Sequence, residues 1–137
     1  EYYRITCMVP MIFMGVTEEA AMEGTIDAVR EKMAAGNEMT VRGIGTILDI
    51  SGGGARFVSE EKFEANQFVL MELELISDKM DKQYHIKGRI VGWKKLEYRE
   101  PRYETRIEFI MEDNKVREDI IRYIFEEERK KRRNEKG

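Results

Sequence analysis

Residues 44–54, IGTILDISGGG, are the most informative part of this chain. The first of them, Ile44–Leu48, form an apolar run that is typical of a strand. Asp49, Ser51 and three glycines follow directly. Aspartate and serine side chains bond nearby backbone groups, and glycine adopts positive φ angles at no steric cost. By composition alone, the run predicts a strand that ends in an ordinary hairpin turn.

The segments around this turn occur in an order that indicates more than a turn. Arg4 leads into the apolar run Cys7–Met14, and the turn is followed by the alternating run Phe68–Ile76. Gly92-Trp93 and Ile107-Glu108-Phe109 come later, in two strand-like segments that are expected to form the last hairpin of the fold. Together with the Asp-x-Ser-x-x-Gly pattern of the turn, this order resembles PilZ domains, bacterial receptors for the second messenger cyclic di-GMP. The likeness is greatest to the C-terminal domain of flagellar-brake-type proteins.

The alternation of apolar and polar residues predicts antiparallel strands with one buried face. Pro10 indicates that the first strand is an edge strand or a bulged one. Together with the resemblance, the pattern predicts a mainly β fold, a small antiparallel six-stranded PilZ-type β-barrel with a C-terminal α-helix and a helical insertion after the first strand. The residues expected to point into its core include Val69, Met71, Leu73, Leu75, Thr105, Ile107, Phe109 and Met111.

The insertion is expected over about residues 17–36, which lie outside the family pattern and have helical composition. Thr17 and Thr25 are candidate N-caps, and Gly36 is a candidate C-cap. An apolar stripe in this segment either packs on the barrel wall or binds a partner. The stripe consists of Met22, Ile26, Val29 and Met33.

The C-terminal helix is expected over about residues 114–133, with Asn114 as its cap. Its basic run Arg129–Arg133 is either a solvated helix end or a contact for acidic partners. One face of the helix is apolar and is expected to pack on the barrel; it consists of Val116, Ile120, Ile121, Ile124 and Phe125.

The length of 137 residues fits a single PilZ-like domain. We expect the chain to be a fragment that lacks an upstream N-terminal domain, because it has no initiator Met and begins inside the arginine motif of the family. The first arginine of that motif would fall just ahead of Glu1. The lone Cys7 can form no internal disulfide, and no signal peptide or membrane-spanning apolar run is present, so a cytoplasmic location is expected.

Several function classes find no support in the sequence. His85 and Cys7 are the only residues of their types, and they cannot make a structural zinc site by themselves. No catalytic constellation and no triphosphate-binding loop is recognisable, so an enzyme is not expected. The net charge of −3 argues against DNA or RNA binding, which needs a basic face.

The resemblance implies a ligand site and no cofactor beyond the ligand, cyclic di-GMP. A carboxylate such as Asp49 accepts hydrogen bonds from the N1–H and N2–H2 donors of guanine, whereas the O6 and N7 acceptors suit a guanidinium. By the resemblance, Arg4 grips base and phosphate from a flexible arm ahead of the first strand, while Asp49, Ser51, Gly53 and Gly54 hold guanine on the barrel. Arg106 points either toward this ligand surface or into solvent.

The leading hypothesis is therefore a cyclic di-GMP receptor that controls motility or another surface-lifestyle process. In it, the ligand draws the arginine arm onto the barrel, and the altered surface binds a protein partner such as a flagellar motor component. A second hypothesis is a PilZ-like structural or interaction module that no longer binds ligand. A third, an oligonucleotide-binding barrel, is disfavoured by the net acidity.

Overall fold

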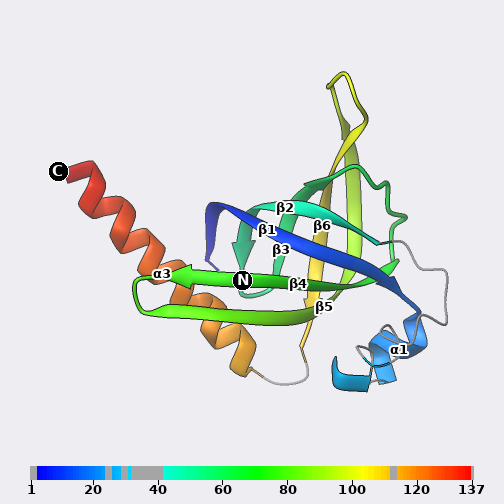
Figure 1. The fold of residues 1–137 in the computed structure, drawn as a ribbon, viewed down its shortest axis with the longest axis horizontal. Coiled ribbons are helices and arrows are strands. Elements are labelled where there is room, and N and C mark those ends of the chain that lie inside the picture. Colours follow the sequence, from blue (N-terminus) through cyan, green and yellow to red (C-terminus); the bar gives the residue numbers. More distant parts are fainter. Residues whose placement is uncertain (1–2, 24–25, 29–30, 32–41, 112–113, 137) are drawn as a thin grey trace.

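The computed structural model of the chain describes residues 3–23, 26–28, 31, 42–111 and 114–136. Six antiparallel strands close into a barrel in the order β1-β2-β3-β6-β5-β4, as the sequence predicts (Figure 1). The strands are β1 Arg4–Val16, β2 Arg42–Ser51, β3 Gly54–Ser59, β4 Phe68–Ser77, β5 Met80–Leu96 and β6 Arg102–Ile110, and the helices are α1 Glu18–Glu23 and α3 Lys115–Lys136.

Strand β1 is paired on both sides, to β2 and to β4, because the ring leaves no edge. Pro10 is tolerated because it lies opposite Thr46 of β2, while the pairing of β1 with β4 begins only at the next residue, Met11. A register shift in the β1–β2 pairing lies between Thr6 and Val9, so β1 is bulged rather than an edge strand.

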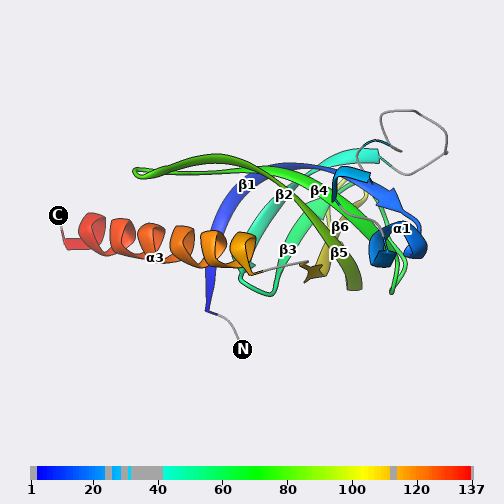
Figure 2. The same ribbon diagram turned by 90° about the horizontal axis from the view of Figure 1, so that it is seen from below.

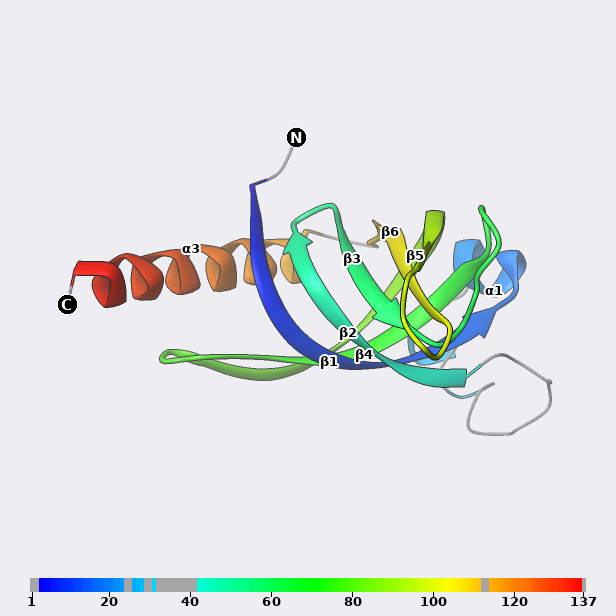
Figure 3. The ribbon, with the colours of Figure 1, turned by 90° about the horizontal axis from the view of Figure 1, so that it is seen from above.

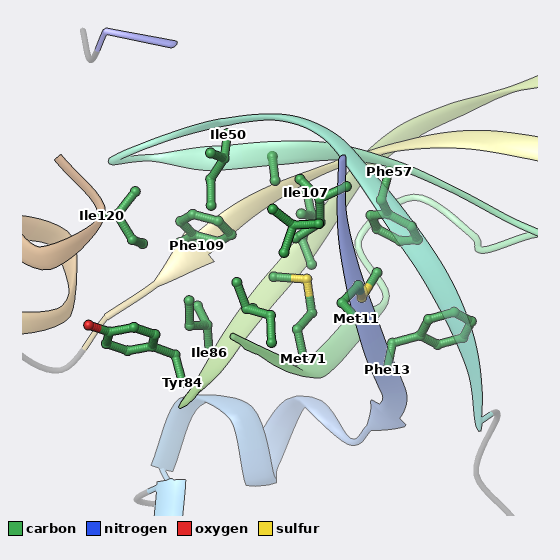
Figure 4. Close-up of a cluster of buried hydrophobic side chains, with 14 of the residues drawn as sticks. Met11, Phe13, Ile50, Phe57, Met71, Tyr84, Ile86, Ile107, Phe109 and Ile120 are labelled. Carbon is green, nitrogen blue, oxygen red and sulfur yellow. The ribbon is translucent and has the colours of Figure 1, made fainter. Parts of the chain in front are cut away.

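The barrel interior is filled by the predicted inward faces of the strands (Figure 4). Three phenylalanine rings, of Phe13, Phe57 and Phe63, meet with centroid distances of 5.1–6.0 Å at one part of this core. Toward α3 the core continues through Ile50, Phe109 and Ile120 (Figure 4). Six of the predicted inward residues of β4 and β6 are at most 3% exposed, namely Val69, Met71, Leu73, Leu75, Thr105 and Ile107.

Helix α3 lies at the end of the barrel where β1 begins, and α1 lies at the opposite end (Figures 1 and 3). Seen from below, α3 runs on past the barrel beside the β4–β5 hairpin (Figure 2). The helix starts directly after Asn114, whose backbone carbonyl accepts the amide of Glu118 at 2.9 Å. Its buried face is made by Ile120, Tyr123 and Ile124. The prediction for Phe125 is wrong, because that side chain is half exposed, one residue beyond the i, i+3, i+4 stripe that faces the barrel.

Helix α1 confirms the predicted cap, because the amide of Ala20 donates to Oγ1 of Thr17 at 3.1 Å. Ala21 is fully buried, and its carbonyl accepts a hydrogen bond from Nζ of the buried Lys87 at 2.9 Å. Met22 is 60% exposed, so it is not part of a packed stripe. Ile26 is half-buried. The predictions for Thr25, Val29, Met33 and Gly36 lie outside the described residues.

Candidate functional site

A β-bulge in β2 sets the position of Asp49. In the register with β3, Ile47 lies opposite Phe57 and Asp49 lies opposite Arg56, so Leu48 is an additional residue. Strict alternation would place Ile47 and Asp49 on the same face of the strand. Because of the extra residue, Ile47 and Ile50 are both fully buried in the core, while Asp49 lies on the outer face of the barrel.

The carboxylate of Asp49 is held between two arginines. Oδ1 accepts a hydrogen bond from Nη1 of Arg4, and Oδ2 accepts one from Nε of Arg56 at 2.7 Å. The side chain of Asp49 is only 11% exposed, because the two guanidinium groups cover it. Nη1 of Arg56 also contacts Oε1 of Glu104, and Oε2 of Glu104 lies 3.5 Å from Nζ of Lys94. The result is a row of alternating charges across the outer face of the barrel.

Arg4 is the first residue of β1 and lies opposite Ser51 in the register, so the prediction that it precedes the first strand is wrong. The reason is that β2 extends to Ser51 and supplies a ladder partner for Arg4. Half of the Arg4 side chain remains exposed although it contacts Asp49. The hydrogen bond to Asp49 is the largest cause of the pKa of Arg56 rising above its ordinary value.

The turn after β2 is organised by the hydroxyl of Ser51. Its Oγ accepts the amides of Gly53 and Gly54 at 3.2 Å each and donates to the carbonyl of Gly54 at 3.3 Å. Ser51 is 4% exposed, so these bonds hold the turn from within. A Cβ atom at Gly54 would lie 2.4 Å from the carbonyl oxygen of Ile107, and only glycine allows this approach of β3 to β6.

Helix α3 contacts both halves of this site. Nε of Arg117 donates to the carbonyl of Gly52 in the turn at 2.9 Å. The ring of Tyr3, next to Arg4, stacks on the ring of Phe125 with a centroid distance of 6.3 Å and an interplanar angle of 18°. One helix therefore contacts both the N-terminal arm and the glycine turn.

Of the residues predicted for the site, Arg4, Asp49, Ser51, Gly53 and Gly54 lie together at one end of the barrel. Arg106 lies on the same outer face, opposite Arg56 in the β3–β6 register. Its Nη2 would be 3.2 Å from a Cβ atom at Gly92. Within the described part of the chain, the side chain of Arg106 has no hydrogen-bond or ion-pair partner.

Three residues of the site are not among those predicted from the sequence: Arg56, Glu104 and Arg117. A signal for Arg56 exists, because the turn of residues 51–54 puts residue 56 beside Asp49 once the two strands are paired. Glu104 and Arg117 are 48 and 65 residues from their partners. Nothing local in the sequence indicates these two contacts.

The described residues contain no group of three His, Cys, Asp or Glu side chains that would suit a metal ion. None of the helices in the described ranges has the length and apolar character that a membrane span requires. The groups that define this site are therefore arginines, one carboxylate, one hydroxyl and glycine backbone, on the surface of a closed six-stranded barrel. Such a set of groups suits an anionic, hydrogen-bonding ligand.

Comparison with known proteins defines the family. The sequence profile of the PilZ domain matches residues 30–126, which is more than half of the chain. The chain therefore belongs to the PilZ family. A search of curated proteins found no match.

Solved structures share the fold at low sequence identity. The chain is similar to the inhibitor of motility MotI/DgrA of Bacillus subtilis, with 14% identity, a TM-score of 0.64 and coverage of 96% of this chain and 51% of that one. It is also similar to YcgR of Escherichia coli in complex with c-di-GMP, with 15% identity, a TM-score of 0.62 and coverage of 99% and 49%. The isolated PilZ domain of YcgR with c-di-GMP gives 14% identity, a TM-score of 0.62 and coverage of 99% and 96%. The chain thus spans about half the length of MotI/DgrA and of YcgR.

Proposed function

We propose that this chain is a cyclic di-GMP receptor domain that binds the ligand beside the turn of residues 51–54. The observation that carries the proposal is the arrangement of Arg4, Asp49 and the Ser51–Gly54 turn on the outer face of a PilZ barrel. Support also comes from YcgR, which has a similar fold and whose structures contain c-di-GMP. The ligand is the only small molecule that the function requires.

Asp49 is the group that reads guanine. A carboxylate has about four lone-pair positions, so Asp49 can keep its bond to Arg56 and still accept hydrogen bonds from the N1–H and N2–H2 donors of the base. Ser51 acts through the turn, because its hydroxyl is committed to the amides of Gly53 and Gly54. Those glycines let the backbone approach the ligand closely.

Arg4 covers Asp49 when no ligand is bound and moves to the ligand when it binds. A guanidinium pairs with phosphate in a bidentate manner and also stacks on base planes, so the dinucleotide offers Arg4 a richer set of contacts than one carboxylate oxygen. This transfer is the arm closure of the proposed mechanism. Arg106 lies on the same face, and its guanidinium has no partner among the described residues, so it adds a second cation toward the phosphates.

The finer biological role is part of the same proposal. Closure of the arm changes the surface around β1 and α3, and this surface binds a protein partner such as a flagellar motor component in the cytoplasm. Support comes from the similar fold of MotI/DgrA, which is named as an inhibitor of motility. In cells that depend on this protein for motility control, substitution of Asp49 is expected to abolish the response of swimming speed to cyclic di-GMP.

The direct test is calorimetric titration of cyclic di-GMP and cyclic di-AMP into the chain and into Asp49→Asn. We expect cyclic di-GMP to bind and cyclic di-AMP to bind at least tenfold more weakly, because adenine has no N2 amine and presents an acceptor at N1. The buried carboxylate would then face an unpaired acceptor, which costs about 1–3 kcal/mol.

Asp49→Asn should remove most of the affinity for cyclic di-GMP while the unliganded chain stays folded. Equal affinity of the unsubstituted chain for the two dinucleotides would contradict the role of Asp49 as the guanine reader. Absence of any binding would instead favour the structural or interaction module that no longer binds ligand.

A further inference from the structure

We infer that Arg56 is the positioning residue of this site, with Glu104 as its support, and that it sets the selectivity of Asp49 for guanine. This inference rests on the proposed function and extends it, because neither residue belongs to the Asp-x-Ser-x-x-Gly pattern or to the arginine arm. Arg56 is the only described side chain that bonds both Asp49 and a second carboxylate.

The contacts of Arg56 fix two of its edges. Nε donates to Oδ2 of Asp49 at 2.7 Å, and Nη1 donates to Oε1 of Glu104 on the neighbouring strand β6. Glu104 is itself held by Nζ of Lys94 at 3.5 Å. A planar guanidinium that is bonded at two edges cannot rotate without breaking one of the bonds, so it holds the carboxylate plane of Asp49 in one orientation.

This orientation matters because Asp49 has two oxygens with different neighbours. Oδ2 is bonded by Arg56, and among the described residues Oδ1 is bonded only by Arg4, whose side chain is half exposed. When Arg4 moves to the ligand, Oδ1 is the oxygen that becomes available to guanine. A site that is built to hydrogen-bond donors on its ligand discriminates strongly only when its own groups are held in place.

Two other roles for Arg56 make different predictions. If Arg56 contacted the phosphates directly, its loss would weaken cyclic di-GMP and cyclic di-AMP by the same factor, because both carry the same backbone. If it only stabilised the barrel, its loss would lower the thermal midpoint and leave the selectivity unchanged. Positioning of Asp49 predicts a loss of selectivity.

The experiment compares Arg56→Gln, Arg56→Lys and Glu104→Gln with the unsubstituted chain by calorimetry with both dinucleotides. Arg102→Gln is the matched control, because Arg102 has a similar exposure of 33% against 34% and forms its ion pair with Glu60 at 2.7 Å, away from Asp49. The thermal midpoint of every variant is measured without ligand.

We expect Arg56→Gln to weaken cyclic di-GMP at least tenfold, the size typical for loss of a group that orients a ligand-binding side chain. The affinity for cyclic di-AMP should change less than threefold, so the selectivity falls. Arg56→Lys restores the charge but not the two-edged contact, and should recover the affinity only in part. Glu104→Gln should act in the same direction with a smaller effect, and Arg102→Gln should change neither affinity.

An equal loss for both dinucleotides in Arg56→Gln, or full recovery in Arg56→Lys, would overturn the positioning role. A loss of the same size in Arg102→Gln would overturn it too, because any surface arginine would then suffice.

A second measurement needs no ligand. In an NMR spectrum of the arginine guanidinium groups of the free chain, the Nε–H of Arg56 should exchange with water more slowly than that of Arg106, and Glu104→Gln should speed its exchange. Equal exchange of the two arginines would overturn the positioning contact itself. If the unsubstituted chain binds neither dinucleotide, the proposed function fails, and this measurement still decides whether Arg56 holds the carboxylate.

Discussion

Ser51 shows how one hydroxyl can matter to a binding site that it does not face. Its Oγ bonds the amides of Gly53 and Gly54, and the side chain is almost completely buried. The hydroxyl thus sets the path of the glycine backbone that the ligand would approach. We therefore expect stability and ligand binding to be coupled at this residue.

Ser51→Ala is expected to lower the free energy of unfolding by about 1–3 kcal/mol, because two amides lose their acceptor. It should also weaken cyclic di-GMP binding. Ser59→Ala is the matched control, since Ser59 is equally buried at 4% and bonds the backbone of Glu61 in a turn away from the site. Thermal unfolding and calorimetry separate the two effects. A Ser51→Ala chain that loses stability but binds with normal affinity would show that the turn does not shape the site.

Cys7 gives a prediction on pH. Burial raises the pKa of its thiol from 9.0 to about 11, and the nearby Asp49 adds to the rise. The unfolded chain releases this proton near pH 9, whereas the folded chain keeps it until about pH 11. The stabilisation is therefore fully present below pH 9 and is lost as the pH rises toward 11.

The unfolding free energy of the unsubstituted chain is expected to fall more between pH 9 and 11 than that of Cys7→Ala. Urea unfolding at a series of pH values measures the difference. The tyrosines titrate in both chains, but burial and, in smaller part, Cys7 raise the pKa of Tyr123, so the comparison reports Cys7 together with its coupling to Tyr123. Parallel pH curves for the two chains would show that the thiol has the same pKa in the folded and unfolded states.

At the scale of elements, helix α3 joins parts of the site that belong to different strands. Arg117 bonds the carbonyl of Gly52 at the end of β2, and Phe125 stacks on Tyr3 ahead of β1. The same helix is anchored in the core by Ile120, Tyr123 and Ile124. The helix therefore contacts both parts of the site while its buried face packs on the core.

Arg117→Gln is expected to lower the free energy of unfolding by about 1 kcal/mol, because the guanidinium bond to a partly buried carbonyl is lost. The amides of Gly53 and Gly54 should then exchange faster with water. Arg122→Gln is the control, since Arg122 is 62% exposed and its one ion pair among the described residues is with Asp119 of the same helix. Hydrogen exchange on the three chains decides the matter, and unchanged exchange in the turn would show that Arg117 does not hold it.

The elements also show which features the sequence could predict. The strands and α3 followed from alternating and helical apolar patterns, which are local properties of the chain. Asp49 was predicted for the site, but its outward orientation depends on the extra residue Leu48, and a bulge changes the face of every later residue. The helix gives a different error. The apolar pattern predicts Phe125 in the core and omits Tyr123, although Tyr123 is the buried one, because each position along a helix rotates the side chain by about 100°.

At the scale of the whole molecule, the barrel brings together residues that are far apart in the sequence. Asp49 meets Arg4 across 45 positions, and Arg56 meets Glu104 across 48. These contacts exist only because β1 pairs with β2 and β3 pairs with β6 in the closed ring. The arrangement of the charged side chains around Asp49 is thus a product of the topology, and no short segment of the sequence contains all of them.

The same topology predicts how ligand binding spreads through the molecule. Both halves of the proposed site, the arm at Arg4 and the turn at Gly52, contact α3, whereas α1 lies at the other end of the barrel (Figure 3). Saturating cyclic di-GMP should therefore slow amide exchange near Arg4, in the turn and along residues 117–125, and leave α1 unchanged, because ordering the arm also fixes the ring that stacks on Phe125. Phe125→Ala should keep most of the affinity but lose the added protection in the helix. If the arm gains no protection, arm closure is wrong; if the arm gains it and α3 does not, the helix does not respond to the ligand.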